Sequence, residues 1–256
     1  MQEAPVFVIS TGRSGSTLLQ RLLNCHPGLV VWGEHHGFLG GLGYTFNRMF
    51  IEGDENPFPR DGQPNPGPAQ LLPTLTDPAA EIEWANPWTA EEYADQLRGF
   101  ISGYFGRVPA GVRWGFKEIR YQAHGQFEML RRLYPAGHFL FLRRNPMAVA
   151  RSKTLAWGDQ PAIDALPFTV RTEAIRERIA EVRSQYVTYE EFVTTFPDTG
   201  TLVDYETLVA DPRLVMARLF ERLALDPDAY DWSLADQVIG RRISSTIDAT
   251  DPAPLV

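Results

Sequence analysis

Short apolar runs alternate with amphipathic stretches along most of the chain. The runs at residues 6–9 and 137–142 are rich in β-branched and aromatic side chains, which is typical of strands buried on both faces of a parallel sheet. Further strands are expected at residues 29–32, 112–118 and 201–205. Strands that alternate with helices predict a three-layer α/β domain, in which helices flank a mainly parallel central sheet.

Apolar side chains recur three or four positions apart between these runs, which predicts helices. Asn145 as N-cap and Pro146 in the first turn open a helix that runs to about residue 157. Asp211 and Pro212 begin another, which continues through residue 223. Further helices are expected at about residues 18–23, 89–104, 127–133, 173–192 and 234–239.

The whole chain, residues 1–256, is expected to form a single domain. Its irregular part is residues 52–90, which hold eight of the 20 prolines and so favour neither a helix nor a central strand. Three interpretations of this insertion stay open: a solvated loop, a lid over a substrate, or one wall of an acceptor site.

Composition narrows the range of partners. A net charge of −8 argues against nucleic acid as the main partner, because phosphate binding needs a basic face. One cysteine excludes an internal disulfide and suits a reducing compartment. No apolar run reaches membrane-spanning length and the first residues lack the form of a signal peptide, so a cytoplasmic protein is expected.

Residues 11–17, Thr-Gly-Arg-Ser-Gly-Ser-Thr, lie between the first strand and the first helix. The first N–H groups of a helix are unpaired and lie at the positive end of its dipole. Glycines let the backbone approach an anion, hydroxyl groups add donors, and Arg13 adds a fixed charge. The loop therefore predicts an anion site, although it lacks the Gly-Lys-Ser/Thr of nucleotide triphosphatases.

A second anion site is predicted at the end of the fourth strand. Arg144 closes that strand, and Ser152 lies eight residues on, two turns into the next helix. A helix N-terminus beside a guanidinium and a hydroxyl suits a phosphate monoester. Arg143 could take the place of Arg144, but the spacing to Pro146 and Ser152 favours Arg144.

Together these two motifs resemble those of the sulfotransferases that use 3′-phosphoadenosine-5′-phosphosulfate (PAPS) on a P-loop-like fold. Arg13-Ser14-Gly15-Ser16-Thr17 resembles their 5′-phosphosulfate loop, and Arg144-Asn145-Pro146 with Ser152 resembles their 3′-phosphate motif. The resemblance implies that these residues bind PAPS and its product, 3′-phosphoadenosine 5′-phosphate (PAP), without a metal ion. The chain is most similar to the bacterial and tyrosylprotein members.

The resemblance extends to further candidate residues. Glu34 follows the second strand, where tyrosylprotein and several bacterial sulfotransferases carry their catalytic base, and its neighbours His35 and His36 are rivals for that role. Lys117 resembles the lysine that meets the donor, so Glu34, Lys117 and Arg13 are the expected catalytic residues. Ile119 stands where the cytosolic enzymes have a catalytic histidine.

Two donor contacts rest on looser similarity. Tyr205 begins a Tyr-Glu-x-Leu segment that resembles a family motif after the last core strand. Arg242 lies where family members close over the 3′-phosphate, although the Gly-x-x-Gly-x-x-Lys form is missing.

The acceptor implied is a hydroxylated small molecule, sugar, lipid or peptide, with the aromatic helix at 100–105 as a further candidate wall. Two other classes stay open: a P-loop nucleoside or sugar kinase that uses Mg-ATP, and a non-catalytic nucleotide-binding scaffold.

Overall fold

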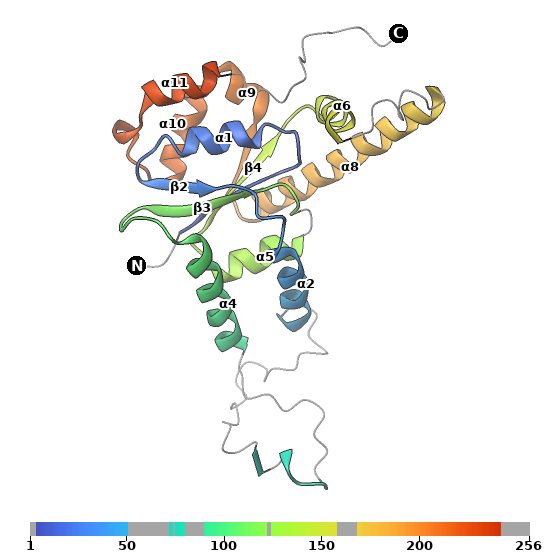
Figure 1. Cartoon of the computed structure of the whole chain (residues 1–256), viewed down its shortest axis with the longest axis vertical. Coiled ribbons are helices and arrows are strands. Elements are labelled where there is room, and N and C mark those ends of the chain that lie inside the picture. Colours follow the sequence, from blue (N-terminus) through green and yellow to red (C-terminus); the bar gives the residue numbers. More distant parts are fainter. Residues whose placement is uncertain are drawn as a thin grey trace.

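The chain forms a five-stranded parallel sheet with the strand order β2-β3-β1-β4-β5, as the computed structural model shows (Figure 1). The structure describes residues 4–50, 72–73, 75–79, 90–121, 124–157 and 168–241. The strands are β1 (Val6–Ser10), β2 (Leu29–Trp32), β3 (Arg113–Glu118), β4 (His138–Arg143) and β5 (Gly200–Asp204). Every strand pair is parallel, which confirms the predicted fold class.

Helices cover both faces of the sheet (Figure 1). Apolar residues of α1 (Ser16–Leu23), α9 (Tyr205–Ala210), α10 (Pro212–Leu223) and α11 (Trp232–Gly240) form one core with Val6 and Val8 of β1. Residues of α2 (Leu39–Phe50), α4 (Ala90–Phe105), α5 (His124–Leu133) and α8 (Phe168–Thr195) form the other core with Phe7 and Ile9. Alternate side chains of β1 thus enter opposite cores, as the period of a strand requires.

The predicted boundaries agree closely with the observed ones, except at four elements. The long helix α8 extends beyond the predicted 173–192 at both ends, and α9 and the 3-10 turn η1 (Pro227–Ala229) were not expected. Helix α2 was also missed, although Leu39, Leu42 and Phe46 recur at helical spacing and pack in the core. Most of the proline-rich 52–90 segment lies outside the described residues, so its role stays a prediction.

Two of the predicted helices begin at the expected capping residues. Asn145 Oδ1 accepts hydrogen bonds from the N–H groups of Met147 (2.9 Å) and Ala148 (3.3 Å), so it caps α6 (Pro146–Trp157) as expected. Asp211 caps α10 in the same way, through the N–H of Leu214 at 2.9 Å. Across the parts of the chain that the structure describes, no helix is both long and apolar enough to cross a bilayer.

Gly115 allows β1 and β3 to approach. A Cβ atom at this position would lie 2.1 Å from the carbonyl oxygen of Val6, a backbone atom that cannot move without disturbing the sheet. We expect Gly115→Ala to lower the free energy of unfolding by about 2–3 kcal/mol, measured by urea denaturation. Gly103 in α4 is the matched control, because a Cβ there meets nothing within 4 Å.

Gly103→Ala should stabilise the protein by about 0.5–1 kcal/mol, since alanine is the better helix former. Equal effects of the two substitutions would contradict the close approach of β1 and β3.

Candidate active site

The polar candidates lie at one edge of the sheet, where the carboxyl ends of the parallel strands meet. Glu34 follows β2, Lys117 lies near the end of β3, and residues 11–17 follow β1. Arg144 follows β4 and Tyr205 follows β5. Because β1 lies between β3 and β4, the predicted anion loop, residues 11–17, occupies the middle of this edge.

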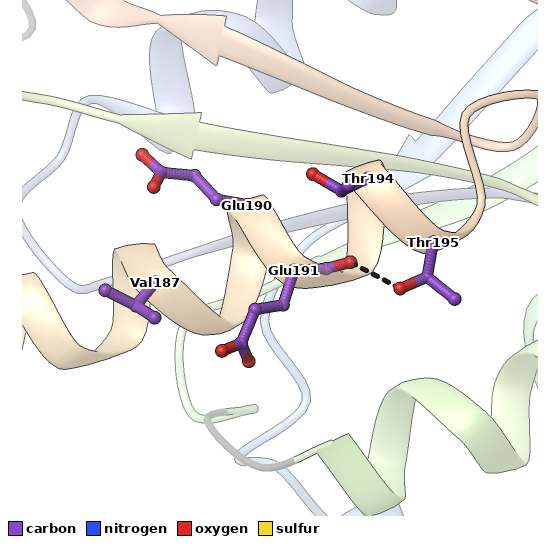
Figure 2. Close-up of a pocket in the computed structure, with 5 residues that line it drawn as sticks. All are labelled: Val187, Glu190, Glu191, Thr194 and Thr195. Atoms are coloured by element: carbon purple, nitrogen blue, oxygen red, sulfur yellow. Dashed lines mark hydrogen bonds between the residues drawn. The ribbon is translucent and has the colours of Figure 1, made fainter.

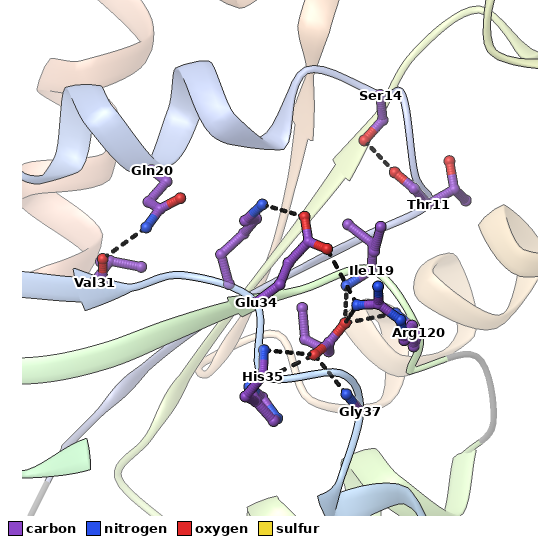
Figure 3. Close-up of polar contacts among 11 residues, drawn as sticks. Thr11, Ser14, Gln20, Val31, Glu34, His35, Gly37, Ile119 and Arg120 are labelled. Atoms are coloured by element: carbon purple, nitrogen blue, oxygen red, sulfur yellow. Dashed lines mark hydrogen bonds and ion pairs between the residues drawn. The ribbon is translucent and has the colours of Figure 1, made fainter. Parts of the chain in front are cut away.

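The loop after β1 is held in a strained, ordered conformation. Arg13 has φ +70° and Gly15 has φ +93°, and the Ser14 hydroxyl donates to the Thr11 carbonyl at 2.7 Å (Figure 3). A left-handed arginine costs free energy, and such residues cluster at binding sites. The N-cap residue of α1 is Gly15, which has no side chain to accept from the first N–H groups of the helix, and these groups lie at the loop.

Tyr205 packs directly on this loop. A Cβ atom at Gly15 would lie 2.3 Å from the Tyr205 ring, so only glycine fits beneath it. The Arg144 guanidinium lies over the Tyr205 ring, with its Cζ 4.6 Å from the ring centroid. Tyr205 therefore joins the ends of β4 and β5 to the anion loop.

The two predicted phosphate motifs contact each other. Arg13 Nε donates to Ser152 Oγ at 3.0 Å, and Arg144 Nη1 donates to the Arg13 carbonyl at 3.1 Å. The pairs lie 139 and 131 residues apart in sequence, so the tertiary fold brings them together.

Arg143, the alternative to Arg144, is turned toward carboxylates. Its guanidinium pairs with Asp204 at 2.8 Å and also with Glu190. The backbone of Arg144 is fixed by Tyr186, whose hydroxyl accepts from the Arg144 N–H (3.0 Å) and donates to its carbonyl (2.9 Å). Arg144 is therefore the arginine that contacts the loop.

Glu34 lies between two cations. Its Oε1 pairs with Lys117 Nζ at 2.6 Å and its Oε2 with Arg120 Nη1 at 3.1 Å (Figure 3). The Lys117 side chain is 5% exposed and that of Glu34 is 31% exposed. A carboxylate that is partly open to solvent and fixed at both oxygens can receive a proton from a group that arrives at this edge.

Glu118 and Arg120 were not singled out by the sequence. Glu118 is fully buried, and its carboxylate accepts hydrogen bonds from Arg120 and from backbone N–H groups, including those of His35 and Gly37. Burial alone would raise the pKa of Glu118, but these hydrogen bonds hold it below its ordinary value. The sequence feature that could have pointed to Glu118 is an acidic residue at the end of an otherwise buried strand.

The two histidines after Glu34 differ in their surroundings. The His35 ring packs against Phe105 and Phe116, and its Nε2 is hydrogen-bonded to the Tyr121 hydroxyl. Burial lowers the pKa of His35 to about 4, so the ring is neutral near neutral pH. His36 is exposed. His35 is therefore enclosed in the aromatic core, which leaves Glu34 as the partly exposed acidic group beside it.

The sequence model of the sulfotransferase family matches residues 5–229, which include every strand of the sheet. The chain belongs to the sulfotransferase family. A search of the curated proteins by sequence found no match.

Solved structures show the same fold at low identity. The sulfotransferase domain of the Synechococcus PCC 7002 olefin synthase is 23% identical, with a TM-score of 0.54 over 91% of this chain and 77% of that one. A sulfotransferase from Alicyclobacillus acidocaldarius is 16% identical, with a TM-score of 0.52 over 93% and 90%. The sulfotransferase domain from the curacin biosynthetic pathway is 18% identical, with a TM-score of 0.51 over 89% and 76%.

One predicted donor contact falls on a residue that the structure does not describe. Arg242 lies outside the described residues, so its donor contact stays a prediction. Figure 2 shows a hollow along α8, lined by Val187, Glu190, Glu191, Thr194 and Thr195, which shares no residue with the strand-end loops. Within the ranges that the structure describes, no three His, Cys, Asp or Glu residues lie close enough to hold a metal ion.

The buried His35 predicts acid sensitivity of this sulfotransferase. Its pKa is about 4 when folded and about 6.5 when unfolded, so the unfolded chain binds the proton more readily as the pH falls between these values. From about pH 7 to about pH 4.5, the wild type should lose about 2–3 kcal/mol more unfolding free energy than His35→Asn.

Urea denaturation at both pH values measures this difference. His36→Asn, at the exposed neighbour, is the control and should keep the wild-type pH dependence. If His35→Asn also kept it, the ring would not be neutral in the folded protein.

Proposed function

We propose that this sulfotransferase moves a sulfuryl group from PAPS to an acceptor hydroxyl by in-line transfer, with Glu34 as the base. The observation that carries the proposal is the contact between the two phosphate motifs, Arg13 with Ser152 and Arg144 with the Arg13 carbonyl. A donor with phosphate groups at both ends of one nucleoside matches two coupled anion sites. A kinase or GTPase substrate has no 3′-phosphate for the second site to bind.

The 5′-phosphosulfate is assigned to residues 13–17 and the N-terminus of α1. Its negative charge suits the first N–H groups of α1, the hydroxyls of Ser16 and Thr17, and the Arg13 guanidinium. The Ser14 hydroxyl donates to the Thr11 carbonyl, so Ser14 would contribute its backbone N–H. The 3′-phosphate is assigned to Arg144 and Ser152, with Tyr205 as a further donor contact and Arg242 as a candidate beyond the described residues. The residues present therefore suit PAPS and, after transfer, PAP.

The reaction requires stabilisation of the negative charge that develops on the leaving group. The bond between sulfur and the donor's phosphate oxygen breaks as the bond from the acceptor oxygen to sulfur forms, and PAP leaves with the developing negative charge. Arg13, Lys117 and the loop N–H groups can stabilise this charge. The sulfuryl group carries less negative charge than a phosphoryl group, so these cations can serve without a metal ion.

Glu34 would accept the proton of the acceptor hydroxyl as that hydroxyl attacks. Lys117 Nζ pairs with Glu34 Oε1. Lys117 pairs in register with Val8 of β1, the strand that leads into the anion loop. A lysine between the base and the donor can pass from the carboxylate to the phosphosulfate and leave Glu34 free to accept the proton.

Exposed aromatic rings in the loop after Glu34 and on α4 form a cluster that is the candidate acceptor wall. Phe38 follows Glu34 by four residues, and its ring packs edge-on against Phe100 (6.2 Å) and Tyr104 (5.5 Å) of α4. All three side chains are exposed. The acceptor class remains a hydroxylated small molecule, sugar, lipid or peptide. The single cysteine, Cys25, is buried, which agrees with the proposed cytoplasmic location.

The direct test is transfer from labelled PAPS, in the presence of EDTA, to a panel of phenols, sugars, fatty alcohols and tyrosine peptides. We expect donor-dependent sulfation in EDTA. Glu34→Ala should keep its affinity for PAP and lose about 10²–10⁴-fold in turnover, because one general base contributes about that factor. Glu128→Gln, at an ion pair on α5, is the surface control.

Phosphorylation of the panel by Mg-ATP would instead identify a kinase, and nucleotide binding without any transfer would identify a scaffold. Full turnover by Glu34→Ala would remove Glu34 from the role of base.

A further inference from the structure

We propose that Glu118 is a positioning residue for sulfuryl transfer, because its buried carboxylate holds both the turn that carries Glu34 and, through Arg120, the Glu34 carboxylate itself. The inference rests on the proposed role of Glu34 as base. It adds a residue that touches no reacting atom and acts through one that does.

Glu118 joins two strand ends by backbone hydrogen bonds. Its Oε2 accepts from the N–H groups of His35 (3.1 Å) and Gly37 (2.8 Å) in the loop after β2. Its Oε1 accepts from the N–H groups of Ile119 (2.8 Å) and Arg120 (3.2 Å) directly after β3. The side chain is 0% exposed, and a buried carboxylate is stable only when it is compensated in this way.

The turn after Glu34 needs this support. His36 has φ +57° and Gly37 has φ +64°, so two consecutive residues adopt the left-handed conformation. That conformation costs free energy for His36, and the loop keeps it only if surrounding contacts compensate. Glu118 binds the N–H groups immediately before and after His36, which fixes the direction in which Glu34 leaves β2 (Figure 3).

Arg120 links the carboxylate of Glu118 to that of Glu34. Its Nη1 donates both to Glu118 Oε1 (2.8 Å) and to Glu34 Oε2 (3.1 Å). The other oxygen of Glu34 is held by Lys117, the residue before Glu118. Glu118 thus anchors the backbone and one of the two cations that orient the proposed base.

A carboxylate is required for this arrangement, because the five groups that hydrogen-bond to Glu118 are all donors. Glutamine has the same shape but replaces one acceptor oxygen with an NH₂ donor, which would face N–H groups. Glu118→Gln therefore keeps the volume of the side chain and removes the hydrogen bonds that one of its two oxygens accepts.

The test is a double-mutant cycle on single-turnover transfer, with the best acceptor of the panel. We expect Glu118→Gln to lower the transfer rate by about 10²-fold, the loss that a small misplacement of a catalytic group causes, with PAP affinity changed by less than about twofold. In the Glu34→Ala background, Glu118→Gln should change the remaining rate by less than about twofold, since the residue acts through Glu34.

A purely structural role would behave differently. It would lower the rate by the same factor in both backgrounds, or leave the rate of the folded enzyme unchanged, and either result would overturn the proposal. Arg120→Gln provides a second variant should Glu118→Gln fail to fold, because it keeps the four backbone hydrogen bonds. It should lower the rate less than Glu118→Gln, again only when Glu34 is present.

A crystal structure of Glu118→Gln tests the positioning without any assay. The 2.6 Å contact between Glu34 and Lys117 should be lost or lengthened, while the Arg13–Ser152 contact remains. An unchanged Glu34 in that structure would overturn the proposal. Failure of the proposed function is separate, since it would appear as no transfer by the wild type or as full transfer by Glu34→Ala.

Discussion

The parallel pairing of β1 with both β3 and β4 is the constraint on which the site depends. It places the anion loop between the strand end that carries Lys117 and the one that carries Arg144. Phe7 of β1 secures this placement, with ring centroids 5.0 Å from Phe116 of β3 and 4.9 Å from Phe139 of β4. The same packing that stabilises the core therefore sets the spacing of the charged residues at the edge.

The arginines at this edge have different partners, and this separates their roles. Arg143 pairs with Asp204 and Glu190, and Arg120 with Glu34 and Glu118, so their charges are largely compensated within the protein. Arg144 instead contacts neutral groups, the Arg13 carbonyl and the Tyr205 ring. A protein with a net charge of −8 can thus present positive charge to an anionic donor at one place.

The features of the fold that depend on a local sequence pattern could be predicted from the sequence. The buried strands are continuous apolar runs, and the Asn145-Pro146 start of α6 follows from its capping residue, so both were predictable. Helix α2 was missed because Gly40, Gly41 and Gly43 weaken its helical signal, and tertiary packing overrides that propensity. The Glu118 network was missed because it joins residues 81 and 83 apart and depends on a left-handed turn that no local pattern specifies.

The central claim is that this edge holds a nucleotide with phosphates at both ends, and calorimetry in EDTA tests it most directly. The wild type should bind PAP without metal and more tightly than adenosine 5′-phosphate, which lacks the 3′-phosphate. Arg144→Ala should weaken PAP by about 10- to 100-fold, the value of a charged hydrogen bond, and adenosine 5′-phosphate by less than about twofold. Equal weakening of both nucleotides, or PAP binding that requires magnesium, would contradict the account.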